Sequence, residues 1–339
     1  MPTATVGNGI TFHYTDSGLP VESDYFTVII VHGHSFSSGL FQKLSLLAPS
    51  QSLRVICIDR REYNGSTPFT LEELQIINQG SEEERSALLT EQGLLLALLI
   101  DDLIQTLSLP LQNYGAISGW SLGNVFTVAM INAIDHPELP RESKGRLKAF
   151  LRTYIIWDTV SQLLGIESPP GFYFPFWDYD IPEEERGAVI KTYISSHFNH
   201  GADVLALCDT SRLNHRHATP GTSTIDRMTE EELQSVVDFQ AGAKCDTAIL
   251  EPSYYKLHYE SVQKALLDED SNTSKWGMTV WNIYGENGCW NILHGSWALK
   301  EKSLQANKKI NFKPVKGKNH FLMWEDPECT ITVLKDCLV

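Results

Sequence analysis

The sequence predicts a doubly wound, mostly parallel α/β sheet that carries an inserted helical cap. Residues 26–31 and 54–59 are short, nearly continuous runs of β-branched and apolar side chains, which are typical of strands buried on both faces of a parallel sheet. A segment with a helical pattern follows each of them, so that strands and helices alternate along the first half of the chain. This alternation indicates a parallel sheet covered by helices on both faces.

The alternation stops near residue 168 and resumes near residue 277. The stretch between these points begins with a dense aromatic cluster and shows no regular succession of strands and helices. We therefore expect three parts in the chain. They are the first part of the α/β core at residues 1–160, a helical cap at residues 161–273, and the second part of the core at residues 274–339.

Local patterns define the individual elements in order. Residues 3–14 alternate in part between apolar and polar side chains, which predicts an edge strand. Ser81 and Glu84 have the spacing of a capping box, so a long helix should begin there and end before Pro110. The expected strands cover residues 3–14, 26–31, 54–59, 114–118, 153–157, 277–285 and 310–315. The expected helices cover residues 40–47, 81–107, 124–133, 144–151, 182–199, 230–240 and 293–301, with a last one after residue 321.

The composition disfavours several classes of function. The chain has 339 residues, of which 42% are hydrophobic and 20% are charged, as in an ordinary globular protein. A net charge of −15 without a basic stripe disfavours nucleic acid and membrane as partners, so we expect a small-molecule substrate. The sequence is also compatible with a homodimer. The 6 cysteines include no C-x-x-C pair, and we expect neither metal nor cofactor. The first residues do not have the pattern of a signal peptide, and we expect a cytoplasmic location.

The stretch Gly119-Trp120-Ser121-Leu122-Gly123 is the most informative motif. It follows an expected strand and precedes an expected helix, the context in which G-x-S-x-G forms a nucleophile elbow. A serine on such a sharp turn projects its hydroxyl clear of the sheet, and the flanking glycines let strand and helix come close together. The motif therefore predicts a nucleophile at Ser121.

Three further motifs stand at the expected ends of strands. They are His32-Gly33-His34, Asp59-Arg60-Arg61-Glu62-Tyr63-Asn64-Gly65-Ser66 and Gly317-Lys318-Asn319-His320-Phe321. Together with the elbow, they resemble the motifs of the α/β-hydrolase superfamily in order and spacing. The first looks like the family's oxyanion loop, the second like its D-x-R-G-x-G-x-S turn and the third like its histidine loop. The turn departs from the family pattern, since Glu62 and Asn64 replace two glycines. The resemblance covers residues 27–327 except the cap and implies the α/β-hydrolase fold.

The resemblance also implies a catalytic triad. A serine hydroxyl needs a base to act as a nucleophile at neutral pH, and by position that base is His320. An acid must fix the tautomer of the imidazole. The family usually places it on the loop after the penultimate strand, where Gly288 stands at the expected position and Glu286 nearby; some members carry it after the preceding strand, where Asp158 stands. We expect Asp158 to be the acid and keep Glu286 as the alternative.

The remaining site residues belong to an oxyanion hole and a substrate pocket. The backbone amides of Leu122 and His34 should form the hole. Aromatic side chains of the cap, with a tryptophan beside the serine, should line an apolar pocket and provide specificity. The residues expected in this pocket are Trp120, Phe172, Phe174, Phe176 and Trp177.

These residues support three hypotheses of function. The first is a serine hydrolase that cleaves an ester, lactone or thioester of a fairly apolar small molecule through an acyl-enzyme. The second keeps the fold without hydrolysis: a cyclase, isomerase or acyl transferase for a polyketide- or terpenoid-like secondary metabolite, with a dry cap that suppresses attack by water. The third is a non-catalytic receptor or binding protein, and the complete set of serine, acid and histidine argues against it because a pure binder has no physical need for all three. We favour the first.

Overall fold

A central sheet organises the structure. The computed structural model describes residues 2–111 and 115–338. Its strands are β1 (Thr3–Val6), β2 (Ile10–Asp16), β3 (Phe26–Val31), β4 (Leu53–Ile58), β5 (Gly115–Trp120), β6 (Leu151–Trp157), β7 (Thr279–Gly285) and β8 (Ile310–Val315). Their order in the sheet is β1-β2-β4-β3-β5-β6-β7-β8, in which β1, β2 and β4 pair antiparallel and all later neighbours are parallel. The predicted mostly parallel sheet is confirmed.

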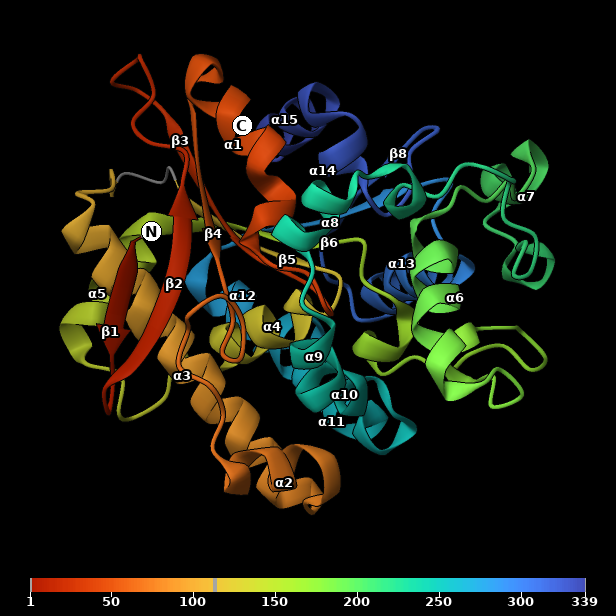
Figure 1. Cartoon of the computed structure of the whole chain (residues 1–339). Helices are drawn as coiled ribbons and strands as arrows, with labels where there is room; N and C mark the ends of the chain where they lie inside the picture. The colour runs from red at the N-terminus through yellow and green to blue at the C-terminus, as the bar shows by residue number, and fades with distance from the viewer. Residues whose placement is uncertain (1, 112–114, 339) are drawn as a thin grey trace.

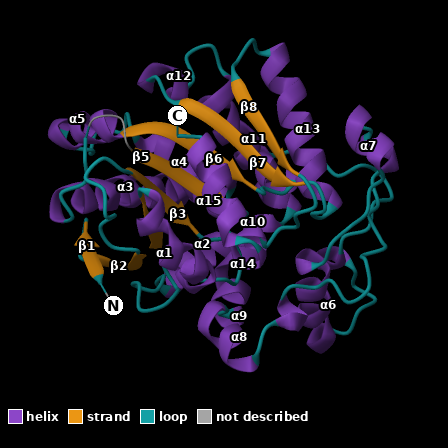
Figure 2. Cartoon of the chain, turned by 90° about the horizontal axis from the view of Figure 1, so that it is seen from above, coloured by secondary structure: helices purple, strands orange, loops and turns teal. Residues whose placement is uncertain are grey.

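Helices cover both faces of this sheet (Figures 1 and 2). The core helices are α1 (Gln42–Leu47), α2 (Leu71–Gln79), α3 (Glu82–Thr106), α4 (Gly123–Ala133), α5 (Arg141–Phe150), α13 (Trp290–Gln305), α14 (Leu322–Glu325) and α15 (Pro327–Asp336). In β3, Ile29 and Val31 pack into the same apolar cluster as α3 and α4, whereas Val28 and Ile30 pack with α1 and α15. The strand is thus buried on both faces, which its β-branched sequence predicts.

The chain between β6 and β7 is helical. Its α-helices are α6 (Glu183–Ser195), α7 (Ala202–Leu207), α8 (Glu230–Val236), α9 (Phe239–Ala241), α10 (Thr247–Leu250), α11 (Tyr255–Val262) and α12 (Asn272–Trp276). Two π-helical segments, Gly242–Asp246 and Gln263–Leu267, lie among them. Figure 1 shows α6 and α7 at the right of the molecule and α9 to α11 below the central strands. The expected inserted cap is confirmed as a helical insertion.

The first strand differs from its prediction. The stretch 3–14 is divided between β1 and β2, which pair antiparallel with Val6 opposite Ile10. Gly7, Asn8 and Gly9 all have positive φ and make the tight turn between them. The prediction of a single strand was wrong because the G-N-G sequence forms a hairpin turn.

The stretch before the long helix also differs. The predicted capping box at Ser81 is confirmed, since both of its hydrogen bonds with Glu84 are present. The structure adds α2 immediately before it, with a second capping box between Thr70 and Glu73. Tyr114, the first residue of the predicted strand 114–118, lies outside the described residues.

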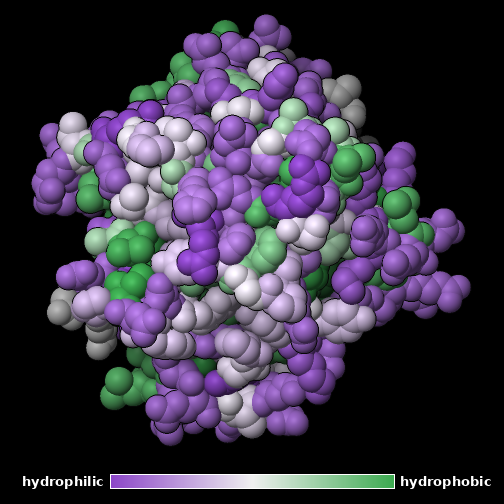
Figure 3. Space-filling view, turned by 90° about the vertical axis from the view of Figure 1, so that its right-hand side faces the viewer, coloured by the Kyte–Doolittle hydropathy of each residue, from purple (hydrophilic) through white to green (hydrophobic). Residues whose placement is uncertain are grey.

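The face that carries α6 and α7 is mainly hydrophilic. Figure 3 views the molecule from the right-hand side of Figure 1, and hydrophobic residues appear there in small separate groups. Among residues 2–111 and 115–338, every helix is too short or too polar to cross a lipid bilayer.

Candidate active site

Ser121 lies on a sharp turn between β5 and α4. Its φ of 54° is in the left-handed region, which is strained for a residue other than glycine and recurs at functional turns. Gly119 and Gly123 permit this turn: a Cβ on Gly119 would meet the backbone of α4 at 2.6 Å, and one on Gly123 would clash with the carbonyl oxygen of Val31. The backbone N–H of Ser121 donates to the carbonyl of Trp157 (2.8 Å), which holds the turn against the end of β6.

His320 and Asp158 lie side by side at the ends of neighbouring strands. Asp158 directly follows β6, and His320 lies in the loop after β8. The Nδ1 atom of His320 is 3.7 Å from Oδ2 of Asp158, and neither atom has a hydrogen bond to another described residue. The other oxygen of Asp158 accepts from the backbone N–H of Gly285 (2.9 Å). Both side chains are buried. A carboxylate in this position can orient an imidazole.

Trp120 supports the histidine. Its ring stacks on that of His320 with centroids 4.6 Å apart and an angle of 23° between the planes. Its Nε1–H donates to the backbone carbonyl of His320 (3.2 Å). The edges of Phe36 and Phe321 pack against the indole, which is itself buried. Stacking on Trp120 thus orients the plane of the imidazole, and the hydrogen bond holds the backbone of His320 in place.

The loop after β3 approaches Ser121 closely. A Cβ on Gly33 would lie 2.8 Å from the Cβ of Ser121, so only glycine fits there. In the part of the chain that the structure describes, the backbone N–H groups of Leu122 and His34 have no hydrogen-bond acceptor. Two unpaired N–H groups beside a serine have the chemistry that an oxyanion hole requires.

Ser121 and His320 share a small cavity under the cap. Its volume is about 40 Å³, and its wall is mostly apolar. The lining residues are His34, Ser121, Leu122, Val160, Leu163, Phe174, Phe176, Ile194, Leu250, Cys289, Asn291, Ile292 and His320. A wider open groove of about 740 Å³ runs along α3 and contains none of these residues. The cavity therefore brings the predicted serine, histidine and oxyanion residues to one place.

The aromatic residues expected in the pocket are divided. Phe174 and Phe176 are in the lining as the structure describes it, whereas Phe172, Trp177 and Trp120 are not. Phe172 stacks on His215 with centroids 4.5 Å apart, and Trp177 packs edge-on against Phe174. These two residues pack against neighbouring aromatic rings and do not face the cavity. Glu286, the alternative acid, follows β7 and is also outside the lining.

Two lining residues at the start of α13 were not expected from the sequence. Asn291 is fully buried; its Nδ2 donates to Oε1 of Gln162 (3.3 Å), and its Oδ1 has no partner among the described residues. Burial raises the pKa of the Cys289 thiol, so this thiol stays protonated and unreactive at neutral pH. The position of Asn291 and Cys289 just after β7 could have indicated that they belong to the site, because ligands of open α/β sheets bind at the carboxyl ends of strands.

The two histidines of the loop after β3 favour the neutral form. Burial, helped by the charge of Arg60, lowers the pKa of His32 to about 4. Its Nδ1–H donates to the carbonyl of Gly33 (2.9 Å) and its Nε2 accepts from the backbone N–H of Arg60 (3.0 Å), which selects one tautomer. Burial also lowers the pKa of His34. Within the described ranges, no group of three or more His, Cys, Asp or Glu side chains is arranged to hold a metal ion.

Comparison with known proteins gives the fold. No model of a protein family and no curated protein matches the sequence. An epoxide hydrolase from Solanum tuberosum is 13% identical with a TM-score of 0.52, over 99% of this chain and 98% of the other. A haloalkane dehalogenase from Bradyrhizobium elkanii is 14% identical with a TM-score of 0.51, over 99% and 95%. An N-acyl homoserine lactone degrading enzyme is 13% identical with a TM-score of 0.51, over 99% of both chains. The chain therefore has the α/β-hydrolase fold.

Proposed function

We propose that the protein is a serine hydrolase that cleaves an ester, lactone or thioester of a small, fairly apolar molecule. One observation carries this proposal: Ser121, in a strained elbow, shares a buried cavity with His320, whose Nδ1 faces the carboxylate of Asp158. Epoxide hydrolases and dehalogenases of this fold use an aspartate nucleophile, and the serine at the elbow favours acyl transfer instead.

The same groups act in both half-reactions, the acylation of Ser121 and the hydrolysis of the acyl-serine. Oγ of Ser121 adds to the carbonyl carbon while its proton passes to Nε2 of His320, and the backbone amides of Leu122 and His34 bind the resulting oxyanion. The imidazolium returns the proton to the leaving alcohol or thiol as the carbon–oxygen or carbon–sulfur bond breaks. Water then attacks the acyl-serine in the same way, which releases the acid and restores Ser121.

The cavity supports a small acyl group. Its volume of about 40 Å³ and its side chains from Val160, Leu163 and Ile292 suit a short apolar chain better than a charged one. We therefore expect p-nitrophenyl acetate and butyrate to react faster than the octanoate.

The test compares wild type with Ser121→Ala on a panel of p-nitrophenyl esters, lactones and thioesters. We expect turnover in the wild type and a loss of about 10⁴-fold or more in the variant, together with loss of labelling by a fluorophosphonate. Ser118→Ala is the matched control, because Ser118 is buried on β5, the strand that leads into Ser121, and its Oγ has no partner among the described residues. Activity that survives in Ser121→Ala would reject the proposal.

The tight, mostly apolar cavity favours acyl transfer as a second candidate, because it leaves little room for water. Reaction in water enriched in ¹⁸O separates the two functions. Hydrolysis places the label in the acid product, whereas transfer to another acceptor leaves the product unlabelled.

A further inference from the structure

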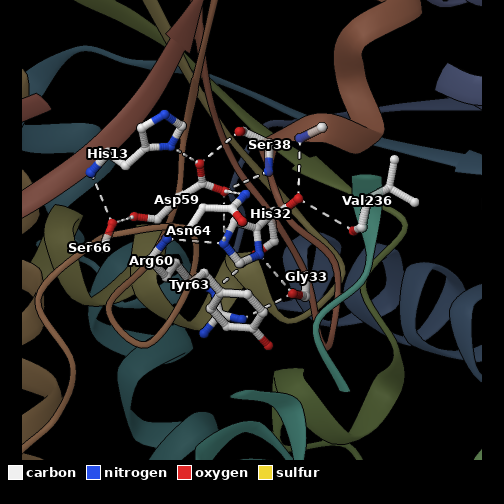
Figure 4. Close-up of polar contacts among 12 residues, drawn as sticks. His13, His32, Gly33, Ser38, Asp59, Arg60, Tyr63, Asn64, Ser66 and Val236 are labelled. Carbon is white, nitrogen blue, oxygen red and sulfur yellow. Dashed lines mark hydrogen bonds and ion pairs between the residues drawn. The ribbon is translucent and has the colours of Figure 1, made fainter. Parts of the chain in front are cut away.

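Arg60 joins the turn after β4 to the loop after β3. Its guanidinium is buried, and Figure 4 shows it beside His32, Gly33 and Tyr63. Nε donates to the carbonyl of His32 (3.1 Å) and Nη2 donates to the carbonyl of Gly33 (3.0 Å). One side chain thus holds two consecutive carbonyls of the loop that approaches Ser121.

The peptide between Gly33 and His34 is therefore fixed in orientation. Its carbonyl accepts from Arg60 and also from Nδ1–H of His32 (2.9 Å). In a trans peptide the N–H points away from the carbonyl. The N–H at the opposite end of this peptide belongs to His34, which lines the cavity with Ser121 and has no acceptor in the described structure. Holding the carbonyl toward Arg60 keeps this N–H directed away from it and available to an oxyanion.

The cap supplies the counter-ion of Arg60. Asp246, the last residue of the π-helical segment Gly242–Asp246, is fully buried and accepts from Nη1 (2.8 Å) and Nη2 (2.7 Å). The hydroxyl of Tyr63 donates to the same carboxylate and accepts from the backbone N–H of Ser35 (2.9 Å). Burial raises the pKa of Asp246, but the charge and hydrogen bonds of Arg60 outweigh it and lower that pKa to about 2. The carboxylate is therefore charged at neutral pH.

We propose that Arg60 and Asp246 are positioning residues for the oxyanion hole, and that the cap segment Gly242–Asp246 thereby controls turnover without contacting substrate. This inference rests on the proposed function. It predicts that removing the charge of Asp246 lowers kcat and leaves KM nearly unchanged, because a hole that is misdirected binds the substrate but stabilises the oxyanion poorly.

The chain offers a matched control for this experiment. Arg61, next to Arg60, makes a similar bidentate pair with Glu73 (2.5 and 2.9 Å), and its other bonds go to the carbonyls of Thr67 and Pro68. Asp246→Asn and Glu73→Gln therefore each neutralise the carboxylate that pairs with a buried arginine, but only the first arginine is bonded to the loop beside Ser121.

We expect Asp246→Asn to lower kcat for p-nitrophenyl butyrate by about 10²-fold, with KM changed by less than about threefold, and Glu73→Gln to stay within about twofold of wild type. Hydrogen–deuterium exchange of the peptide that covers residues 32–35 should rise in Asp246→Asn and stay at the wild-type level in Glu73→Gln. Circular dichroism melting curves of both variants show whether each is folded.

A milder variant keeps the inference testable if Asp246→Asn does not fold. Tyr63→Phe keeps the ion pair but removes one donor to Asp246 and the acceptor of the Ser35 N–H, and we expect a loss of roughly fivefold to tenfold in kcat. If kcat and loop exchange in Asp246→Asn match those of Glu73→Gln, or if an unfolded Asp246→Asn is accompanied by full activity in Tyr63→Phe, the inference is rejected. Failure of wild-type Ser121 to react with the fluorophosphonate would instead reject the proposed function, whatever the exchange data show.

Discussion

Two buried side-chain pairs surround Ser121 differently: Asp158 and His320 lie beside its cavity, whereas Arg60 and Asp246 lie behind the loop that approaches it, and their hydrogen bonding differs. In the pair of Asp158 and His320, the facing atoms are 3.7 Å apart and have no other partner in the described structure. In the pair of Arg60 and Asp246, both carboxylate oxygens accept from the guanidinium at 2.7–2.8 Å, and further donors reach them. The pair of Asp158 and His320 has unused hydrogen-bonding capacity, and we call it the loose cluster. The pair of Arg60 and Asp246 has donors on both carboxylate oxygens, and we call it the saturated cluster.

This difference corresponds to two tasks. A group that transfers protons must change its hydrogen bonds during a reaction, and catalytic bonds are often long in a free enzyme and shorten with substrate. A group that fixes a backbone peptide is most effective when all its bonds are made, because a buried polar atom without a partner is costly. We therefore expect changes in the loose cluster to affect the chemical step directly and changes in the saturated cluster to act through the geometry of the loop.

The largest expected effect comes from the loose cluster. Asp158→Asn should lower kcat by about 10⁴-fold, because an amide in place of the carboxylate favours the wrong imidazole tautomer and does not stabilise the imidazolium. Glu286→Gln should stay within about twofold of wild type, since Glu286 lies outside the cavity lining. Steady-state kinetics on p-nitrophenyl butyrate measures both. The reverse pattern would make Glu286 the acid and Asp158 a structural residue. The unused hydrogen-bonding capacity of the loose cluster would then not indicate a role in catalysis.

The loose cluster could be located from the sequence, and the saturated one could not. Ser121, Asp158 and His320 each follow a predicted strand, and parallel strands bring their carboxyl ends to one edge of the sheet. The structure places all three there. Arg60 and Asp246 are 186 positions apart, and neither belongs to a repeating pattern that would relate a turn of the core to a π-helical segment of the cap.

The cap illustrates the same limit. Its sequence lacks the alternation of strands and helices that gives each side chain a face in the core. Whether Phe172 or Phe174 faces the cavity depends on tertiary packing, and only Phe174 lines it among the two. The elbow and the histidine loop, by contrast, take their direction from regular elements on either side.

A smaller effect should arise at Asn291, which shares one property with the loose cluster. Its Oδ1 is buried in the cavity wall and has no partner among the described residues. If this amide binds a polar group of the substrate, Asn291→Leu should lower kcat/KM by about 10-fold to 100-fold for esters with a hydroxyl or amide on the acyl chain. Plain butyrate should change by less than about threefold. Equal losses on both kinds of ester would show that Asn291 has a structural role.

The smallest effect concerns stability, at a buried histidine whose hydrogen bond and ring contact lie within the cap. His258 in α11 has Nε2–H donating to the carbonyl of Ile249 (2.8 Å), and burial lowers its pKa to about 4 from an ordinary value near 6.5. Between these values the unfolded chain binds a proton that the folded chain does not, so the free energy of unfolding falls as the pH drops from 6.5 toward 4. Lowering the pH from 7.5 to 5.5 should cost wild type about 1.3 kcal/mol more than His258→Gln, as measured by urea unfolding, while kcat at pH 7.5 stays within about twofold. The same pH dependence in both proteins would show that His258 is not held neutral, and a large loss of kcat would mean that the cap histidine is coupled to Ser121 as closely as the saturated cluster is.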